Sequence, residues 1–163
     1  MRRHLWYAAS MESPVEADWQ TNPELFASLP GGAALAEWFG FVPTFHDATL
    51  EGLEISEGAT TLRLKAFRIT SEVDAAGYYV LDRHALVTVS LSGVSGISLT
   101  GNASSIISEL RIRRLSADAP GWHSCSGPEA GDFEIDFTSS YGLYGQLFAR
   151  DLALGFTPMA TPD

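Results

Sequence analysis

Cysteine is almost absent from this sequence. Cys125 is the only one, so an intramolecular disulfide is excluded and nothing indicates an oxidising compartment. No apolar run approaches the roughly 20 residues that a membrane-spanning helix needs. Two arginines near the N-terminus are typical of a secretory signal, but the apolar stretch behind them is short, and Glu12 and Glu16 follow it closely. We therefore expect a cytoplasmic protein without membrane association, in which residues 1–21 form a tail and residues 22–163 a single β-rich domain.

Positive charge is scarce as well. Ten Lys and Arg stand against twenty Asp and Glu, which gives a net charge of −10 at pH 7. A surface this acidic repels nucleic-acid phosphates and anionic lipid, so nucleic acid is not expected as a partner. The same charge favours solubility, and it also speeds the encounter with a basic protein. Two interpretations therefore stay open, a solvated surface and a docking surface for a basic partner.

The beginning of the domain carries two helix signals. Asn22-Pro23-Glu24 combines a capping amide, proline at the first helical position and an acid in the first turn. Pro30-Gly31-Gly32 interrupts this helix, and residues 33–39 predict a second one. Gly40 is placed to end it in a left-handed conformation.

The rest of the chain is typical of strands. Apolar and polar residues alternate at 87–91 and 132–137, which predicts strands with one buried and one solvent-facing side. The alternation changes phase at Ala66, and Gly52 interrupts another strand, so each marks a bulge or a bend. Further strands are expected near 97–100, 106–115, 143–149 and 151–157. The predicted fold is α+β, mainly antiparallel β in a roll or sandwich, with short N-terminal helices.

Sequence motifs of known catalytic chemistry are missing. There is no G-x-S-x-G, and Ser92-Gly93-Val94-Ser95-Gly96 lacks the lysine and the helix of a phosphate loop, so we interpret it as a strand connection. Metal-binding spacings of Cys and His are absent too. We expect no catalytic residue, no metal and no cofactor. The alternative is a metal-assisted hydrolase or lyase of a β-barrel type, which would need His46, His84 and His123 to converge; Cys125 and Asp82 are further candidate ligands.

Residues 38–50, WFGFVPTFHDATL, pose the sharpest question. His46 and Asp47 are adjacent, and neighbouring side chains of a strand point to opposite faces, which does not suit a catalytic pair. We therefore interpret the pair as structural, with Asp47 bonding to backbone amides where a strand begins. His46 is then expected against the surrounding aromatic residues. The residues of this structural motif are Trp38, Gly40, Phe45, His46 and Asp47.

Acidic side chains form a second pattern. Asp132, Glu134 and Asp136 share one strand face at intervals of about 7 Å, and Glu129 lies just before them. They either pair with Arg111 and Arg113 on a neighbouring strand or form a docking strip for a basic partner. If the strip binds a partner, substituting its three strand carboxylates by Asn, Gln and Asn weakens binding while the fold survives.

One resemblance to a known family is carried by the same opening stretch. Trp38 to Ala48, running into Leu50-Glu51-Gly52-Leu53-Glu54-Ile55, resembles the small β-rich immunity-like proteins of bacterial polymorphic toxin systems. Ser140-Tyr141-Gly142-Leu143-Tyr144-Gly145, followed by Leu147-Phe148-Ala149-Arg150, resembles their closing strands. The resemblance covers less than a third of the chain and assigns no contact residues. It implies a non-enzymatic protein that binds and neutralises a cognate toxin.

These observations lead to one expected function and two alternatives. The expectation is an immunity-type inhibitor of a basic toxin, with Asp132, Glu134, Asp136 and Glu129 as the partner-binding residues. The alternatives are the metal-assisted enzyme and a β-roll that uses the aromatic residues as a pocket for a small ligand. The oligomeric state is left open.

Overall fold

The computed structural model describes residues 20–117 and 127–160. His123 and Cys125, two of the candidate metal ligands, lie outside the described residues, as does most of the predicted tail. At the predicted end of that tail, Thr21 is buried, and its hydroxyl accepts a hydrogen bond of 2.9 Å from the backbone N–H of Ile112. The chain is therefore anchored to the domain at this point.

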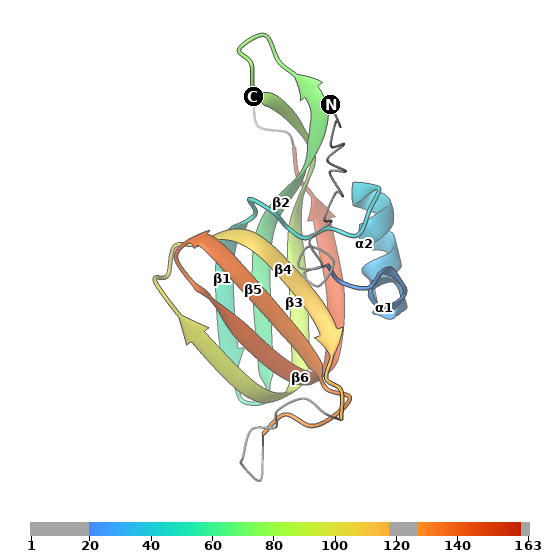
Figure 1. Cartoon of the computed structure of the whole chain (residues 1–163), viewed down its shortest axis with the longest axis vertical. Helices are drawn as coiled ribbons and strands as arrows, with labels where there is room; N and C mark the ends of the chain where they lie inside the picture. The colour runs from blue at the N-terminus through green and yellow to red at the C-terminus, as the bar shows by residue number, and fades with distance from the viewer. Residues whose placement is uncertain (1–19, 118–126, 161–163) are drawn as a thin grey trace, which may run out of the picture.

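Two short helices open the described chain, as predicted. α1 spans Pro23–Ser28, with the side chain of Asn22 accepting from the backbone N–H of Leu25 at 3.0 Å. α2 spans Gly32–Phe39 and ends at Gly40, which has φ 83°. Both helices lie outside the sheet beside β6 (Figure 1). No helix in the described part of the chain is long and apolar enough to cross a membrane.

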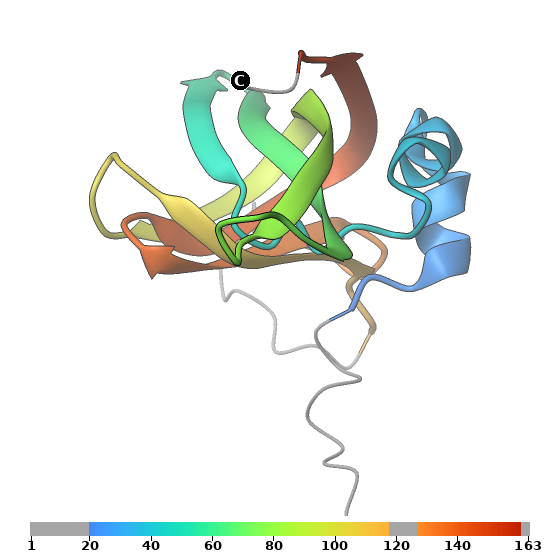
Figure 2. The same cartoon turned by 90° about the horizontal axis from the view of Figure 1, so that it is seen from above.

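Six antiparallel strands close into a barrel in the order β1-β2-β3-β6-β5-β4. The strands are β1 Thr49–Ser56, β2 Ala59–Val73, β3 Tyr79–Thr100, β4 Ile106–Arg114, β5 Phe133–Tyr141 and β6 Tyr144–Pro158. The α+β fold with mainly antiparallel sheet is thus confirmed, and Figure 2 shows the strands curling around a common interior. The expected connection at 92–96 is wrong, because these residues belong to β3 and form an irregularity between Val94 and Gly96. The strands expected at 143–149 and 151–157 are one continuous strand, β6.

The order of the strands requires one crossing. β4, β5 and β6 follow each other as neighbours, whereas β3 pairs with β6, so the connection at 101–105 passes over the β5–β6 turn in Greek-key fashion. Gly142 in that turn has φ 96°, and a Cβ there would lie 1.6 Å from the carbonyl oxygen of Ser104. The Ser105 hydroxyl donates to the carbonyl of Leu143 at 2.8 Å. Two backbones therefore touch where the barrel closes.

Apolar side chains fill the interior of the barrel. The buried residues come from all six strands and include Leu50, Leu62, Leu64, Val87, Val89, Ile107, Leu110, Ile112, Ile135, Phe137 and Leu147. The expected solvent-facing side of β5 is wrong: Asp132 is 7% and Glu134 only 1% exposed. Glu134 is covered because Arg113 of β4 and Gln146 of β6 bond to it from the two neighbouring strands.

The hairpin of β2 and β3 is much longer than the barrel. β1 pairs with β2 only as far as Lys65, and β6 pairs with β3 only from Ala85 onward. Beyond these points the two strands continue alone as a ribbon, drawn in green at the top of Figure 1. We call residues 67–83 the arm. The predicted irregularities at Gly52 and near Ala66 are confirmed, and the second lies where the arm leaves the barrel.

Candidate functional site: a protruding arm and an aromatic pocket

His46 and Asp47 lie in a turn that leads into β1. Phe45 and Asp47 have left-handed backbones, with φ 59° and 63°, and the N–H of Ala48 donates to the carbonyl of Phe45 at 3.0 Å. The expectation that the two side chains point to opposite faces is wrong, because a turn and not a strand carries them. His46 Nδ1 lies 3.1 Å from Asp47 Oδ2, and both side chains are about half exposed.

The aromatic residues of this segment hold the turn to the helices. Phe45 is buried, and its ring stands edge-on to that of Phe39 at 6.4 Å, which offsets the cost of its left-handed backbone. Trp38 packs on Phe156 of β6 with the ring centroids 5.5 Å apart. Its indole N–H donates to the carbonyl of Arg83, whose guanidinium lies 5.2 Å from the centre of the Trp38 ring. The segment therefore connects α2, β6 and the base of the arm.

The carboxylates of the proposed strip on β5 are paired across the sheet. Asp136 accepts from Arg111 at 3.2 Å, and both side chains are largely buried. Glu134 accepts from Arg113 and, at 3.0 Å, from the side-chain amide of Gln146. The four acids do not form one exposed strip, because among them only Glu129 is exposed.

Asp132, the remaining acid of that strip, holds the loop before β5. Its carboxylate accepts from the hydroxyl of Ser95 at 2.8 Å and from the backbone N–H of Glu129 at 3.1 Å. These contacts fix the 129–132 turn against β3. The roles observed for the strand carboxylates are thus pairing and turn formation.

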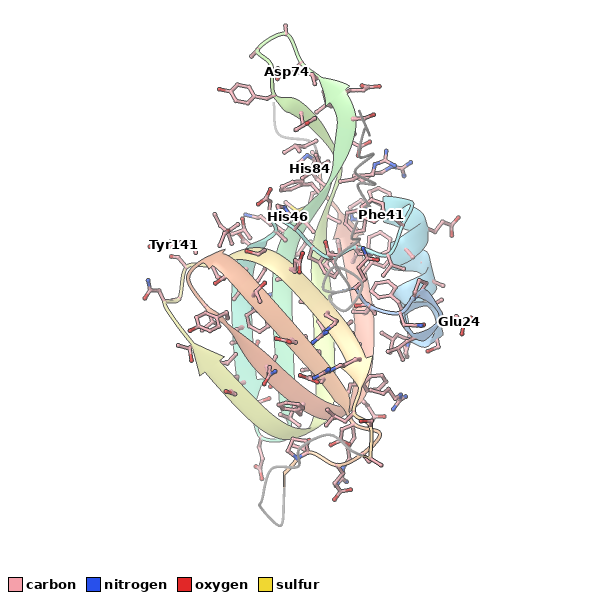
Figure 3. All side chains as sticks on the ribbon, in the orientation of Figure 1. Glu24, Phe41, His46, Asp74, His84 and Tyr141 are labelled. Carbon is pink, nitrogen blue, oxygen red and sulfur yellow. The ribbon has the colours of Figure 1, made fainter. Side chains whose placement is uncertain are left out.

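The described histidines do not assemble a metal site. His46 and His84 both lie near the base of the arm (Figure 3), and the ring of His84 packs against Phe67 with the centroids 5.7 Å apart. Within residues 20–117 and 127–160, no three His, Cys, Asp or Glu side chains come together in an arrangement that could hold a metal ion.

The arm carries an exposed apolar face. Ile69 pairs with Leu81 and Val73 with Tyr79, so these four side chains share one side of the two-stranded ribbon. They are 42%, 36%, 57% and 64% exposed, respectively. Large exposed apolar patches on a soluble domain mark interaction sites more often than chance. An isolated two-stranded ribbon also buries too little surface to be stable by itself, so this face is suited to a partner.

At its base the apolar face meets a pocket. Its volume is about 140 Å³, and the lining comes from the 39–46 segment on one side and from β2 on the other. The lining residues are Phe39, Phe41, Pro43, Thr44, Phe45, His46, Ala66, Phe67 and Ile69. Ile69 belongs both to the pocket and to the arm, so the pocket and the apolar face are one continuous surface.

The opposite face of the arm is polar and carries an ion pair. Arg68 pairs in register with Asp82, and its Nε and Nη2 donate to the two carboxylate oxygens at 2.8 and 2.5 Å. The Thr70 hydroxyl adds a bond of 2.9 Å to the carbonyl of Val80. The hydrogen bond from Arg68 lowers the pKa of Asp82 below its ordinary value of 3.8, and the pKa of Arg68 is raised.

We expect an NMR titration of the Asp82 carboxyl to give a pKa below 3.8, and Arg68→Gln to raise it again. A lowered folded-state pKa means that the pair stabilises the arm at pH values above the unfolded pKa, and that this contribution is lost as the pH falls through the folded pKa. Loss of amide protection in the arm, measured by hydrogen exchange, should follow the same titration. A wild-type pKa at or above 3.8 would contradict the assignment.

The arm was not predicted from the sequence, although a signal for it exists. Asp74-Ala75-Ala76-Gly77 separates two runs rich in β-branched and aromatic residues, which is the pattern of a hairpin with a short glycine-containing loop. In the structure the Asp74 carboxylate accepts from the N–H groups of Ala76 and Tyr78 at 2.8 and 2.9 Å. Asp74 therefore forms the tip of the arm, as Figure 3 shows.

No protein-family model, curated protein or solved structure matches this chain.

Proposed function

We propose that this chain is a non-enzymatic, cytoplasmic binding protein, an immunity-type inhibitor that masks a basic toxin. The observation that carries the proposal is the apolar face of the arm, which projects from an acidic protein and has no cover among the described residues. A protein partner fits such a face better than a small molecule, because the four side chains lie along an open ribbon and do not surround a cavity.

Charge supports a basic partner in particular. The net charge of −10 attracts a basic protein and accelerates the encounter. The cations at the arm are engaged within the protein, Arg68 with Asp82 and Arg83 with the ring of Trp38. The carboxylates of Glu72 and Asp47 are exposed near the apolar face and the pocket. The resemblance of Trp38–Ala48 to immunity-like proteins points to the same class of partner.

Capture of the partner tests this function. The tagged chain, mixed with a lysate of the organism that encodes it and washed at rising salt, is expected to release one basic protein, identified by mass spectrometry. Production of that protein in a host should stop growth, and co-production of this chain should restore it. Absence of a basic protein, or a captured protein without toxicity, contradicts the proposal.

A pair of tyrosine variants tests whether the arm is responsible. Tyr79 and Tyr141 are 64% and 58% exposed, but Tyr141 lies at the edge of the barrel, away from the arm (Figure 3). Tyr79→Ser should weaken capture about tenfold or more, as loss of an aromatic anchor does at interfaces. Tyr141→Ser should leave it unchanged. Equal losses in both variants would place the contact elsewhere.

A further inference from the structure

We propose that the partner docks by strand addition: an extended basic segment pairs with the open edge of β2 in the arm and inserts one apolar side chain into the pocket of Phe39, Phe41, Phe45 and Phe67. This inference rests on the proposed function and names the binding mode of the same surface.

The open edge is the first element of the argument. On the barrel, β2 is paired on both sides, by β1 through Lys65 and by β3, whose pairing extends to Val73 with irregularities between Ala66 and Arg68 and between Ile69 and Val73. Past Lys65, no described residue pairs with the edge of β2 that faces β1 on the barrel. Within this stretch the backbone N–H of Glu72 donates to the Thr70 hydroxyl at 3.2 Å. An unpaired strand edge is a template for another extended chain, and proteins that do not use such an edge usually block it.

The position of the pocket is the second element. Residues 39–46, which precede β1 in the chain, lie on this side of β2. The cavity of about 140 Å³ lies between this segment and β2. A cavity of roughly 150 Å³ holds one benzene ring. In strand addition the main chain supplies affinity and pockets beside the edge select alternate side chains. The pocket is therefore placed and sized for a single leucine- or phenylalanine-sized side chain of the added strand.

Charge decides which segment occupies the edge. Two copies of this chain would bring together net charges of −10 each, so pairing of two arms is disfavoured at low ionic strength. Glu72 beside the edge and Asp47 beside the pocket are both exposed carboxylates. A strand with lysine or arginine at the positions that flank its apolar anchor complements them. The occupant is therefore a basic, extended segment and not a second copy.

Synthetic peptides test the mode without changing the protein. The probe is a peptide of about ten residues that alternates lysine with valine around one central phenylalanine, since a strand of this length covers the arm. We expect it to shift the amide resonances of 67–73 and of the pocket. Replacing its lysines by glutamates, or N-methylating alternate residues along its hydrogen-bonding edge, should each weaken binding about tenfold or more, and salt should weaken it further.

Matched variants separate the pocket from general apolar contact. Phe41 and Ile55 are 51% and 52% exposed, but Ile55 lies at the other end of β2 from the arm, beside the β1–β2 turn. Phe41→Ala is expected to weaken peptide binding about tenfold, as for a hot-spot contact, whereas Ile55→Ala leaves it unchanged. Because both side chains are half exposed, neither substitution should unfold the protein.

The outcomes distinguish this inference from the proposed function. Equal binding of the N-methylated peptide, shifts that map away from the arm, or a dimer of the free chain whose arm amides are protected would each overturn strand addition. If a basic toxin is captured but the amide resonances of residues 67–73 do not shift in its complex, the proposed function stands and strand addition is rejected. If the peptide binds at the β2 edge but no toxin is captured, strand addition stands and the proposed function is rejected.

Discussion

Substituting Asp132, Glu134 and Asp136 together by Asn, Gln and Asn is expected to unfold the protein or to leave it marginally stable. The sequence predicts the opposite for these residues, because an exposed strip would tolerate neutral amides. In the structure all three carboxylates are themselves largely buried and accept hydrogen bonds within the protein. Breaking a buried ion pair by removing one member costs about 3–5 kcal/mol, and a domain has about 5–15 kcal/mol in total.

The pair of Arg111 and Asp136 accounts for the largest part of the expected loss. The two side chains are 8% and 14% exposed, so Asp136→Asn alone leaves a buried guanidinium without its carboxylate. Glu134, which is 1% exposed, loses its charge-assisted bonds from Arg113 and Gln146 when it becomes an amide. Urea denaturation should therefore show a lower midpoint for each single variant, and the largest decrease for the triple variant.

Two controls identify the cause. Glu129 is an exposed acid of the same stretch, and Glu129→Gln is expected to change the free energy of unfolding by less than about 0.5 kcal/mol. Replacing both members of the buried pair with apolar residues, Arg111→Met with Asp136→Leu, should recover most of the stability lost by Asp136→Asn. A folded triple variant with wild-type stability would show that these pairs contribute nothing to the fold.

Local rules explain why the helices and bulges were predictable. The cap of Asn22, the left-handed Gly40 and the interruption at Gly52 each depend on a few neighbouring residues, and all three appear as expected. Closure of the barrel depends instead on the register between β1 and β4, where the N–H of Leu50 meets the carbonyl of Ser105. Residues so far apart in sequence leave no periodic signal that could predict their contact.

The candidate site was predictable only in part, for the same reason. Strand alternation places Glu134 on the side opposite Ile135, which is correct, but it does not reveal that neighbouring strands bury Glu134. The sequence shows the aromatic residues near His46, whereas only the fold places Phe67 and Ile69 in the same pocket. The arm does not follow from the phase change at Ala66, because a bulge or a bend inside a strand gives the same sequence pattern.

Gly142→Ala is expected to be the most damaging single substitution, with a loss of more than about 4 kcal/mol. The added Cβ would lie 1.6 Å from the carbonyl oxygen of Ser104 and 2.8 Å from Cα of Ser105, so the 101–105 connection must move. Ser105 accepts the bond from Leu50 that helps to join β1 to β4, and its hydroxyl bonds to Leu143. Displacement of this connection therefore opens the barrel, and thermal unfolding should show a much lower midpoint.

Gly131→Ala is the control that separates the clash from backbone strain. Gly131 has φ 92°, close to the 96° of Gly142, but a Cβ there meets no atom within 4 Å. Its cost should be that of a left-handed alanine alone, about 1–2 kcal/mol. The difference between the two variants then measures the contact of the crossing connection with the β5–β6 turn. Equal losses of stability in the two variants would mean that the 101–105 segment moves away from the added Cβ at no cost in free energy. The pairing of β1 with β4 would then not depend on the position of this segment.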